Sequence, residues 1–175
     1  MSLFTEEHRL FRNSIKKFVD AEITPKIDSW EKKQFFPTEI FKQLGQAGFL
    51  GILLPEEFGG VGGDYALAAS WCEEFGKIPS VGFTTAVNMH SLVISPTINR
   101  FGSNEQKAAW LPKAIAGTAI GAYAFTEPNA GSDLSQSSAT RTDERPADPL
   151  SHIFTECRRE REFLVLALQR QESRE

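Results

Sequence analysis

The chain has 175 residues, and its apolar (41%) and charged (24%) fractions are close to those of soluble globular proteins. This composition excludes collagen-like, membrane-embedded and wholly disordered chains. A formal net charge of -4 argues against a surface that neutralises nucleic-acid phosphates or anionic lipids. We therefore expect neither nucleic acid nor a membrane as a partner.

Cysteine and histidine positions argue against a disulfide framework and a metal centre. The two cysteines, Cys72 and Cys157, lie far apart, and the three histidines, His8, His90 and His152, show no zinc-ligand spacing. No stretch approaches the roughly 20 apolar residues of a membrane span, and the first residues lack a signal-peptide profile. We expect a cytoplasmic protein without a metal, in which His90 is packed within a helix.

The first half of the chain shows helical periodicity. One amphipathic helix should end at Thr24–Pro25, and its apolar stripe comprises Phe11, Ile15, Phe18 and Val19. A second helix begins near Pro37 and ends before Gly48, which is able to take a positive φ. Residues 49–64 are too rich in glycine and proline for a helix interior, so they should form an ordered loop.

Further helices follow this loop. Asp64 is suited to cap a helix that ends at Gly76, and Ser80 a longer one that Pro96 should break or kink. Ser103 and Gln106 have the spacing of a capping box, which predicts a helix that ends near Gly117. The glutamate pairs 56–57 and 73–74 fit solvated faces.

The glycine cluster at 59–63 does not fit a nucleotide-binding loop. No strand precedes it, and Tyr65 stands where the third glycine of the dinucleotide motif belongs. A turn between two helices accounts better for these residues.

The period then changes to two between Ala119 and Thr126, which predicts one strand followed by a turn at Pro128–Asn129. The strand end and its turn place backbone N–H groups and the hydroxyls of Thr126 and Ser132 at one edge, which is suited to an anion or a heterocycle. A single strand is unstable without partners, so a sheet should begin here.

Composition changes after Gln136. All 13 glycines and every lysine lie in residues 1–136, whereas 7 of the 10 arginines lie in the remainder. We interpret residues 137–175 as an unrelated, poorly packed tail, most simply a frameshifted reading of the gene. Such a tail should be loose, or helical between about Ile153 and Arg170.

The segment AYAFTEPNAGSD at 122–133 resembles the flavin-binding signature of the acyl-CoA dehydrogenase family. LPEEFGG at 54–60, FGSNEQKAAWLPKAIAG at 101–117 and the opening helix match the same family in order. The resemblance implies a mainly α fold, with an N-terminal helical bundle at 1–117 and the first strand of an incomplete β-domain at 118–136. It also implies FAD as cofactor and a homo-oligomeric intact enzyme.

The resemblance assigns roles to individual residues. It places Tyr123, Phe125 and Thr126 against the flavin ring, and Gly131 and Ser132 near the FAD pyrophosphate, with Ser132 also near the phosphates of the CoA thioester. The helix from Val81 to Ser95 would line the acyl chain, with candidate walls that comprise Phe83, Val87 and Leu92. The catalytic glutamate of the family lies in a C-terminal domain without a counterpart here, so no catalytic residue is expected.

The implied reaction is α,β-dehydrogenation of an acyl-CoA, with electron-transfer flavoprotein as acceptor, and the chain by itself should be inactive. One alternative is a helical interaction module that completes a split or full-length flavoenzyme. Another is a fragment of an acyl-CoA oxidase or flavin monooxygenase on the same scaffold.

Overall fold

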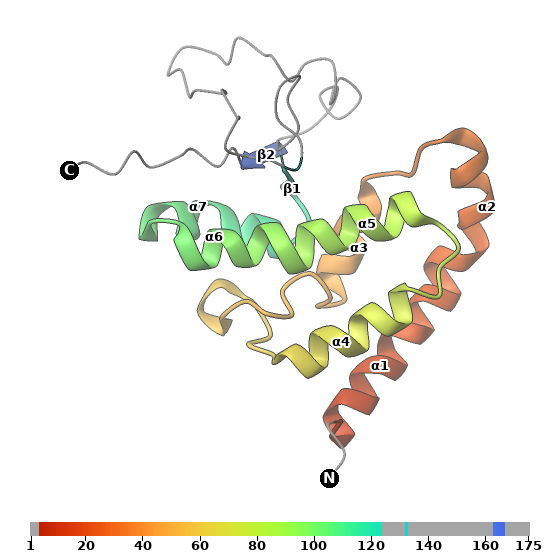
Figure 1. Ribbon diagram of the computed structural model, residues 1–175, viewed down its shortest axis with the longest axis horizontal. Helices are drawn as coiled ribbons and strands as arrows, with labels where there is room; N and C mark the ends of the chain where they lie inside the picture. The colour runs from red at the N-terminus through yellow and green to blue at the C-terminus, as the bar shows by residue number, and fades with distance from the viewer. Residues whose placement is uncertain (1–3, 124–131, 133–162, 167–175) are drawn as a thin grey trace. The chain divides into compact units, whose positions relative to one another are not determined.

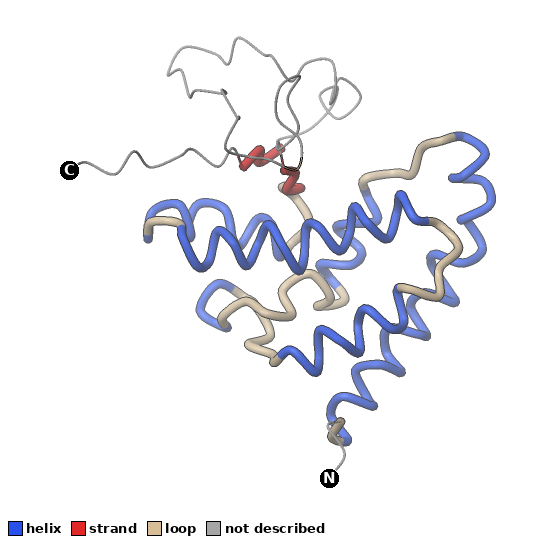
Figure 2. The backbone as a smooth tube through the Cα atoms, in the orientation of Figure 1, coloured by secondary structure: helices blue, strands red, loops and turns tan. Residues whose placement is uncertain are grey.

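The computed structural model describes residues 4–123, 132 and 163–166 (Figure 1). The chain divides between Ile120 and Gly121 into two units, which we describe separately. The described part of the first unit is helical, with the connecting loops that Figure 2 shows.

The first helical segment runs through the predicted stop at Thr24–Pro25. It consists of α1 (Glu6–Phe18), a π-helix η1 (Val19–Ile23) and α2 (Thr24–Lys33). The prediction of a stop is wrong because Pro25 falls in the first turn of α2, where a backbone N–H is not required. The π-helix directly before it absorbs the change in hydrogen-bond spacing, and the N–H of Thr24 bonds five residues back to Val19.

A second long helical segment treats its proline in the same way. It consists of α5 (Val81–Asn88), a π-helix η3 (Met89–Ile94) and α6 (Ser95–Phe101), so Pro96 does not break the helix as predicted. The hydroxyl of Ser95 donates to the carbonyl of His90 at 2.7 Å. This bond satisfies a carbonyl that the altered spacing would otherwise leave without a donor.

The other predicted helices are confirmed. They are α3 (Glu39–Gln46), α4 (Tyr65–Phe75) and α7 (Asn104–Ile115). Asp64 caps α4 by accepting from the N–H of Leu67, and Ser103 and Gln106 form the expected capping box. Helix α7 contains Pro112 without interruption.

The glycine-rich loop folds on itself around a short 3₁₀ helix, η2 (Glu56–Phe58). The N–H groups of Val61 and Gly63 donate to the carbonyls of Gly51 and Ile52, each at 2.8 Å. A Cβ added at Gly60 would lie 2.2 Å from the carbonyl oxygen of Leu54. Close backbone packing thus requires glycine here, as expected for a turn.

Aromatic side chains fill the core. Trp71 and Phe75 of α4 are fully buried and stack with ring centroids 3.8 Å apart. Phe83 of α5 contacts Trp30 of α2 at 5.4 Å and Phe36 at 5.2 Å. Helix α1 packs along α4, as Figure 1 shows, so the cluster ties four helices together.

One of the glutamates expected on a solvated face is buried. Glu74 is 4% exposed and pairs with Lys77 at 2.7 Å and with Arg12 of α1 at 3.5 Å. Helix α4 presents this position to α1, and the two cations compensate the buried carboxylate.

The strand predicted after α7 is present as β1 (Ile120–Tyr123). It pairs with β2 (Phe163–Leu166) in a two-stranded sheet. The expectation of a loose or helical segment at 153–170 is therefore wrong at 163–166, where FLVL has the apolar, partly β-branched composition of a strand. The remainder of that segment lies outside the described residues.

Backbone contact between α3 and the end of α7 generates a prediction about stability. A Cβ at Gly45 would lie 2.6 Å from the carbonyl oxygen of Ile115, whereas one at Gly82 of α5 would meet nothing within 4 Å. We expect Gly45→Ala to lower the free energy of unfolding by about 1–3 kcal/mol, because the neighbouring backbone must move. Gly82→Ala is the matched control and should raise it by about 0.5 kcal/mol. Urea unfolding followed by circular dichroism measures both, and equal effects would contradict the packing.

Candidate functional site

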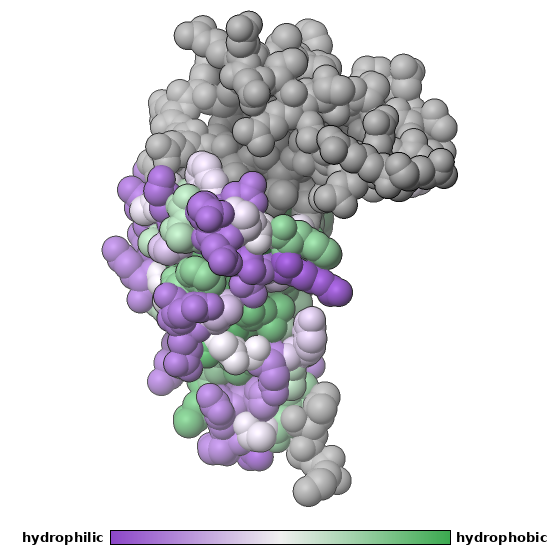
Figure 3. All heavy atoms as spheres, turned by 90° about the vertical axis from the view of Figure 1, so that its left-hand side faces the viewer, coloured by the Kyte–Doolittle hydropathy of each residue, from purple (hydrophilic) through white to green (hydrophobic). Residues whose placement is uncertain are grey.

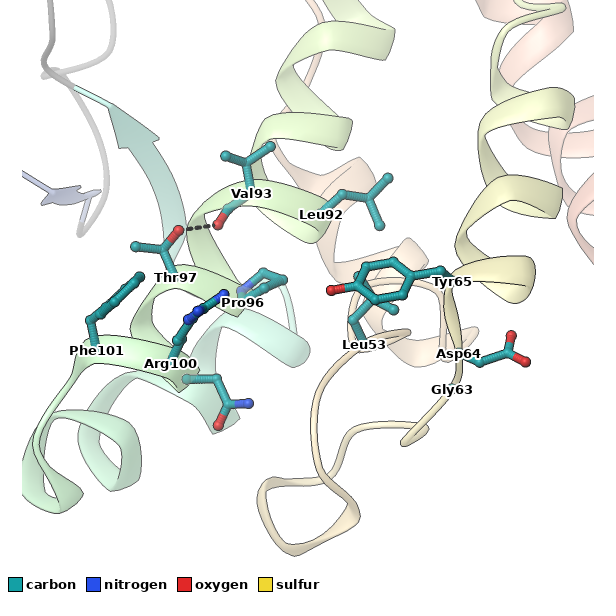
Figure 4. Close-up of a pocket in the computed structure, with 11 residues that line it drawn as sticks. Leu53, Gly63, Asp64, Tyr65, Leu92, Val93, Pro96, Thr97, Arg100 and Phe101 are labelled. Atoms are coloured by element: carbon teal, nitrogen blue, oxygen red, sulfur yellow. Dashed lines mark hydrogen bonds between the residues drawn. The ribbon is translucent and has the colours of Figure 1, made fainter.

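An open groove of about 650 Å³ lies in the helical unit, between the start of α4 and helix α6 (Figure 4). Its walls include Leu53, Tyr65, Leu92, Pro96, Arg100 and Phe101. Figure 4 shows the ring of Tyr65 opposite Pro96 and Arg100, with Leu53 and Leu92 also beside it. The groove is thus apolar at its base and aromatic at its sides.

Large aromatic side chains are exposed at this groove. Tyr65 is 83% exposed and Phe101 is 74% exposed. The guanidinium of Arg100 lies 5.3 Å from the centroid of the Phe101 ring. In Figure 3 apolar patches interrupt the polar surface on one face of the molecule. Exposed aromatic groups of this size are typical of surfaces that bind a ligand or another polypeptide.

The polar groups beside the groove are partly engaged within the fold. The hydroxyl of Thr97 donates to the carbonyl of Val93 at 2.7 Å. Asp64 accepts from the N–H of Leu67 at 2.8 Å and lies 3.0 Å from Nε2 of His8. The N–H of Leu67, and secondly His8, lower the pKa of the Asp64 carboxyl. Asp64 is thus an ionised structural cap rather than a proton donor.

The three candidate acyl-chain walls differ in their surroundings. Phe83 and Val87 are buried in the core, with exposures of 1% and 0%. Leu92, in η3, is half-buried and lines the groove. The structure therefore separates Leu92 from the other two.

Partly exposed positions on the same helix recur at intervals of four residues: Thr84, Asn88 and Leu92. The Oδ1 of Asn88 accepts from the indole Nε1–H of Trp71 at 2.8 Å. Sequence analysis missed Thr84 and Asn88 because it selected the largest apolar side chains, and these face the core. The spacing of polar residues along the helix was the signal that could have found this face.

Two of the five residues assigned to the flavin lie in the described part of the chain. Tyr123 is the last residue of β1, and Ser132 is exposed in a bend. Phe125, Thr126 and Gly131 lie outside the described residues. An exposed serine hydroxyl is accessible to a phosphate oxygen, so Ser132 fits the assigned role.

His90 is fully buried in η3, close to the residues of the groove. Its Nε2–H donates to the carbonyl of Ala114 at 3.0 Å, and its ring meets Phe41 edge-on at 5.3 Å. Burial lowers the pKa of His90 from 6.5 to about 4, against the opposing effect of the Ala114 carbonyl. His90 is therefore a neutral hydrogen-bond donor that joins η3 to α7.

Within residues 4–123, 132 and 163–166, no three histidine, cysteine or acidic residues gather as metal ligands would. The helices of the same described residues are all too short or too polar to cross a bilayer.

Comparison with known proteins identifies the helical unit. Residues 5–118 match the family profile "Acyl-CoA dehydrogenase, N-terminal domain". The chain belongs to the acyl-CoA dehydrogenase family. The predicted fold class, a mainly α chain with the helical bundle of this family, is confirmed.

Individual acyl-CoA dehydrogenases and related proteins match over the same region. The pig mitochondrial long-chain specific acyl-CoA dehydrogenase is 40% identical over 134 residues, which are 75% of this chain and 30% of the relative. A 3-(aryl)acrylate reductase of Clostridium sporogenes is 37% identical over 81% of this chain and 37% of its own length. A Bacillus anthracis acyl-CoA dehydrogenase solved with FAD superposes with a TM-score of 0.72 and 33% identity, over 77% of this chain and 23% of that one. The chain spans about a third of the length of the curated relatives it matches.

Burial of His90 predicts a specific loss of stability in acid. Because the pKa is lower in the folded protein than in the unfolded chain, the contribution is complete above pH 6.5 and is lost as the pH falls toward 4. The loss should amount to roughly 3 kcal/mol. His90→Gln retains a donor but does not titrate, so its free energy of unfolding should fall less over this interval. Urea unfolding across the interval measures the difference between the two curves, in which the shared titration of carboxylates cancels. Parallel curves would contradict the assignment.

Proposed function

We propose that this chain supplies the N-terminal helical domain, and the start of the β-domain, of an FAD-dependent acyl-CoA dehydrogenase. In the intact enzyme the reaction would be α,β-dehydrogenation of an acyl-CoA thioester to the trans-2-enoyl-CoA. The match of residues 5–118 to the family carries this proposal. The flavin signature at 122–133 and the Bacillus anthracis structure with FAD support it.

When bound, FAD supplies the acceptor for the hydride that leaves the β-carbon. The residues proposed to hold it are Tyr123, Phe125, Thr126, Gly131 and Ser132. The hydroxyl of Thr126 and the backbone of Phe125 would donate to the edge of the ring where negative charge develops. Ser132 would bind phosphate oxygens of FAD and of CoA, and Gly131 would allow their close approach.

The acyl chain is proposed to lie against the helix of α5 and η3. Leu92 is accessible and would contact the chain directly. Phe83 and Val87 are buried, so they would support the wall from behind. A carboxylate base would remove the α-proton, and it belongs to a C-terminal domain without a counterpart in this sequence.

The chain by itself should therefore be inactive, because neither the base nor the remainder of the FAD site is present. In the intact enzyme we expect electron-transfer flavoprotein as electron acceptor and a homo-oligomer. The location we propose is cytoplasmic; because the pig relative is named mitochondrial, fractionation of the source cells is the test.

A helical module that completes a separately encoded remainder is the second candidate. The exposed Tyr65 and Phe101 favour it, because a partner would bury them. The name of the Clostridium relative, a reductase, shows that the reaction direction can differ within similar proteins. An oxidase or monooxygenase on the same scaffold is a further alternative for the chemistry.

Purification of the full chain tests inactivity. We expect no yellow flavin after purification and no reduction of a dye acceptor with short-, medium- or long-chain acyl-CoA. A full-length acyl-CoA dehydrogenase assayed in parallel is the positive control. Robust turnover would refute the proposal, whereas flavin binding restored by the product of a neighbouring reading frame would establish the interaction module.

The unrelated origin of residues 137–175 is part of the proposal and has its own test. Sequencing the gene on both sides of the Gln136 codon should reveal a reading frame that encodes further β-strands of the family. An uninterrupted frame without such strands would refute the frameshift.

A further inference from the structure

His8 joins the first turns of two helices. It is 8% exposed, and its Nδ1 lies 3.0 Å from the backbone N of Thr5 and 2.7 Å from the Thr5 hydroxyl oxygen. Its Nε2 lies 3.0 Å from Oδ1 of Asp64, the N-cap residue of α4. One imidazole thus connects the capping box of α1 with the cap of α4.

These contacts determine where the ring proton lies. A backbone N–H can only donate, so the Nδ1 that faces the N–H of Thr5 must accept and carries no proton. Nε2 then carries the proton and donates to Asp64. Both ring nitrogens are engaged, and each contact depends on the protonation state of the ring.

We propose that His8 is a proton-sensitive switch for the first turn of α1. Protonation converts Nδ1 into a donor, so the ring must release the Thr5 N–H and donate instead to the Thr5 hydroxyl. The same proton places a positive charge beside Asp64, which makes that hydrogen bond charge-assisted. Acid therefore opens one half of the capping box and strengthens the contact between α1 and α4.

The charged groups around the ring are consistent with this exchange. On α1 they are Glu6, Glu7, Arg9 and Arg12, and the guanidinium of Arg12 is directed to the Phe4 ring and to Glu73 and Glu74 of α4. Among the described contacts, Asp64 is the carboxylate that meets the imidazole. Asp64 is followed by Tyr65, so the switch acts at the edge of the groove.

NMR of the full chain between about pH 8 and about pH 5, where histidine changes charge, tests the switch. At the higher pH the ring ¹⁵N shifts should report the Nε2–H tautomer of His8. On acidification the amide proton of Thr5 should move upfield, with the same midpoint as the His8 ring. In His8→Gln this movement should be absent.

Thr5→Ser and Thr5→Ala form the matched pair. Serine retains the hydroxyl acceptor, so its pH response should equal that of the wild type. Alanine removes the acceptor, so helical ¹³Cα shifts in the first turn should decrease on acidification beyond any loss already present at the higher pH. An Nδ1–H tautomer at the higher pH, a Thr5 amide that does not follow the ring, or equal responses of the two variants would each overturn the proposal. If the alanine variant does not fold, the ring tautomer and His8→Gln still decide.

Discussion

The arrangement of the helical unit depends on the burial of Trp71. Its indole is fully buried, stacks on Phe75, and has one polar atom that must find an acceptor. That acceptor is Asn88 of α5, at 2.8 Å. A buried N–H without a partner costs about 1–3 kcal/mol, so α4 and α5 are held in the one register in which Trp71 meets Asn88.

This register determines which face of α5 is available to a ligand. Phe83 is drawn into the ring cluster with Phe75, and Val87 follows it into the core. The face with Thr84, Asn88 and Leu92 is left partly exposed. The hydrogen bond that secures the core thus also fixes the surface that we propose faces the acyl chain, and it uses the Oδ1 of Asn88 in doing so.

The two π-helices show how the long helices accommodate proline. Each lies directly before a Thr-Pro or Ser-Pro pair, at 24–25 and 95–96, so that the proline starts a new α-helical turn. In η3 the altered spacing also places His90 within reach of the Ala114 carbonyl. A local irregularity in the backbone therefore contributes a contact between helices that a regular helix would not place there.

Local chemistry in the sequence determined most of the elements. Asp64, Ser80 and Ser103 were recognisable as caps, because their oxygens need only backbone N–H groups three residues away. The family was readable from ordered motifs, and the glycine cluster from its failure to match a nucleotide loop. These signals involve residues that are close in the chain.

Tertiary structure decided the features that depend on distant neighbours. The continuation of two helices past proline, the burial of Glu74 beside Arg12 and the inward direction of Phe83 all require knowledge of what packs against each helix. The pairing of β1 with β2 joins segments about 40 residues apart. Sequence periodicity reports that a side chain is apolar or charged, whereas only the packed neighbours determine whether it is covered.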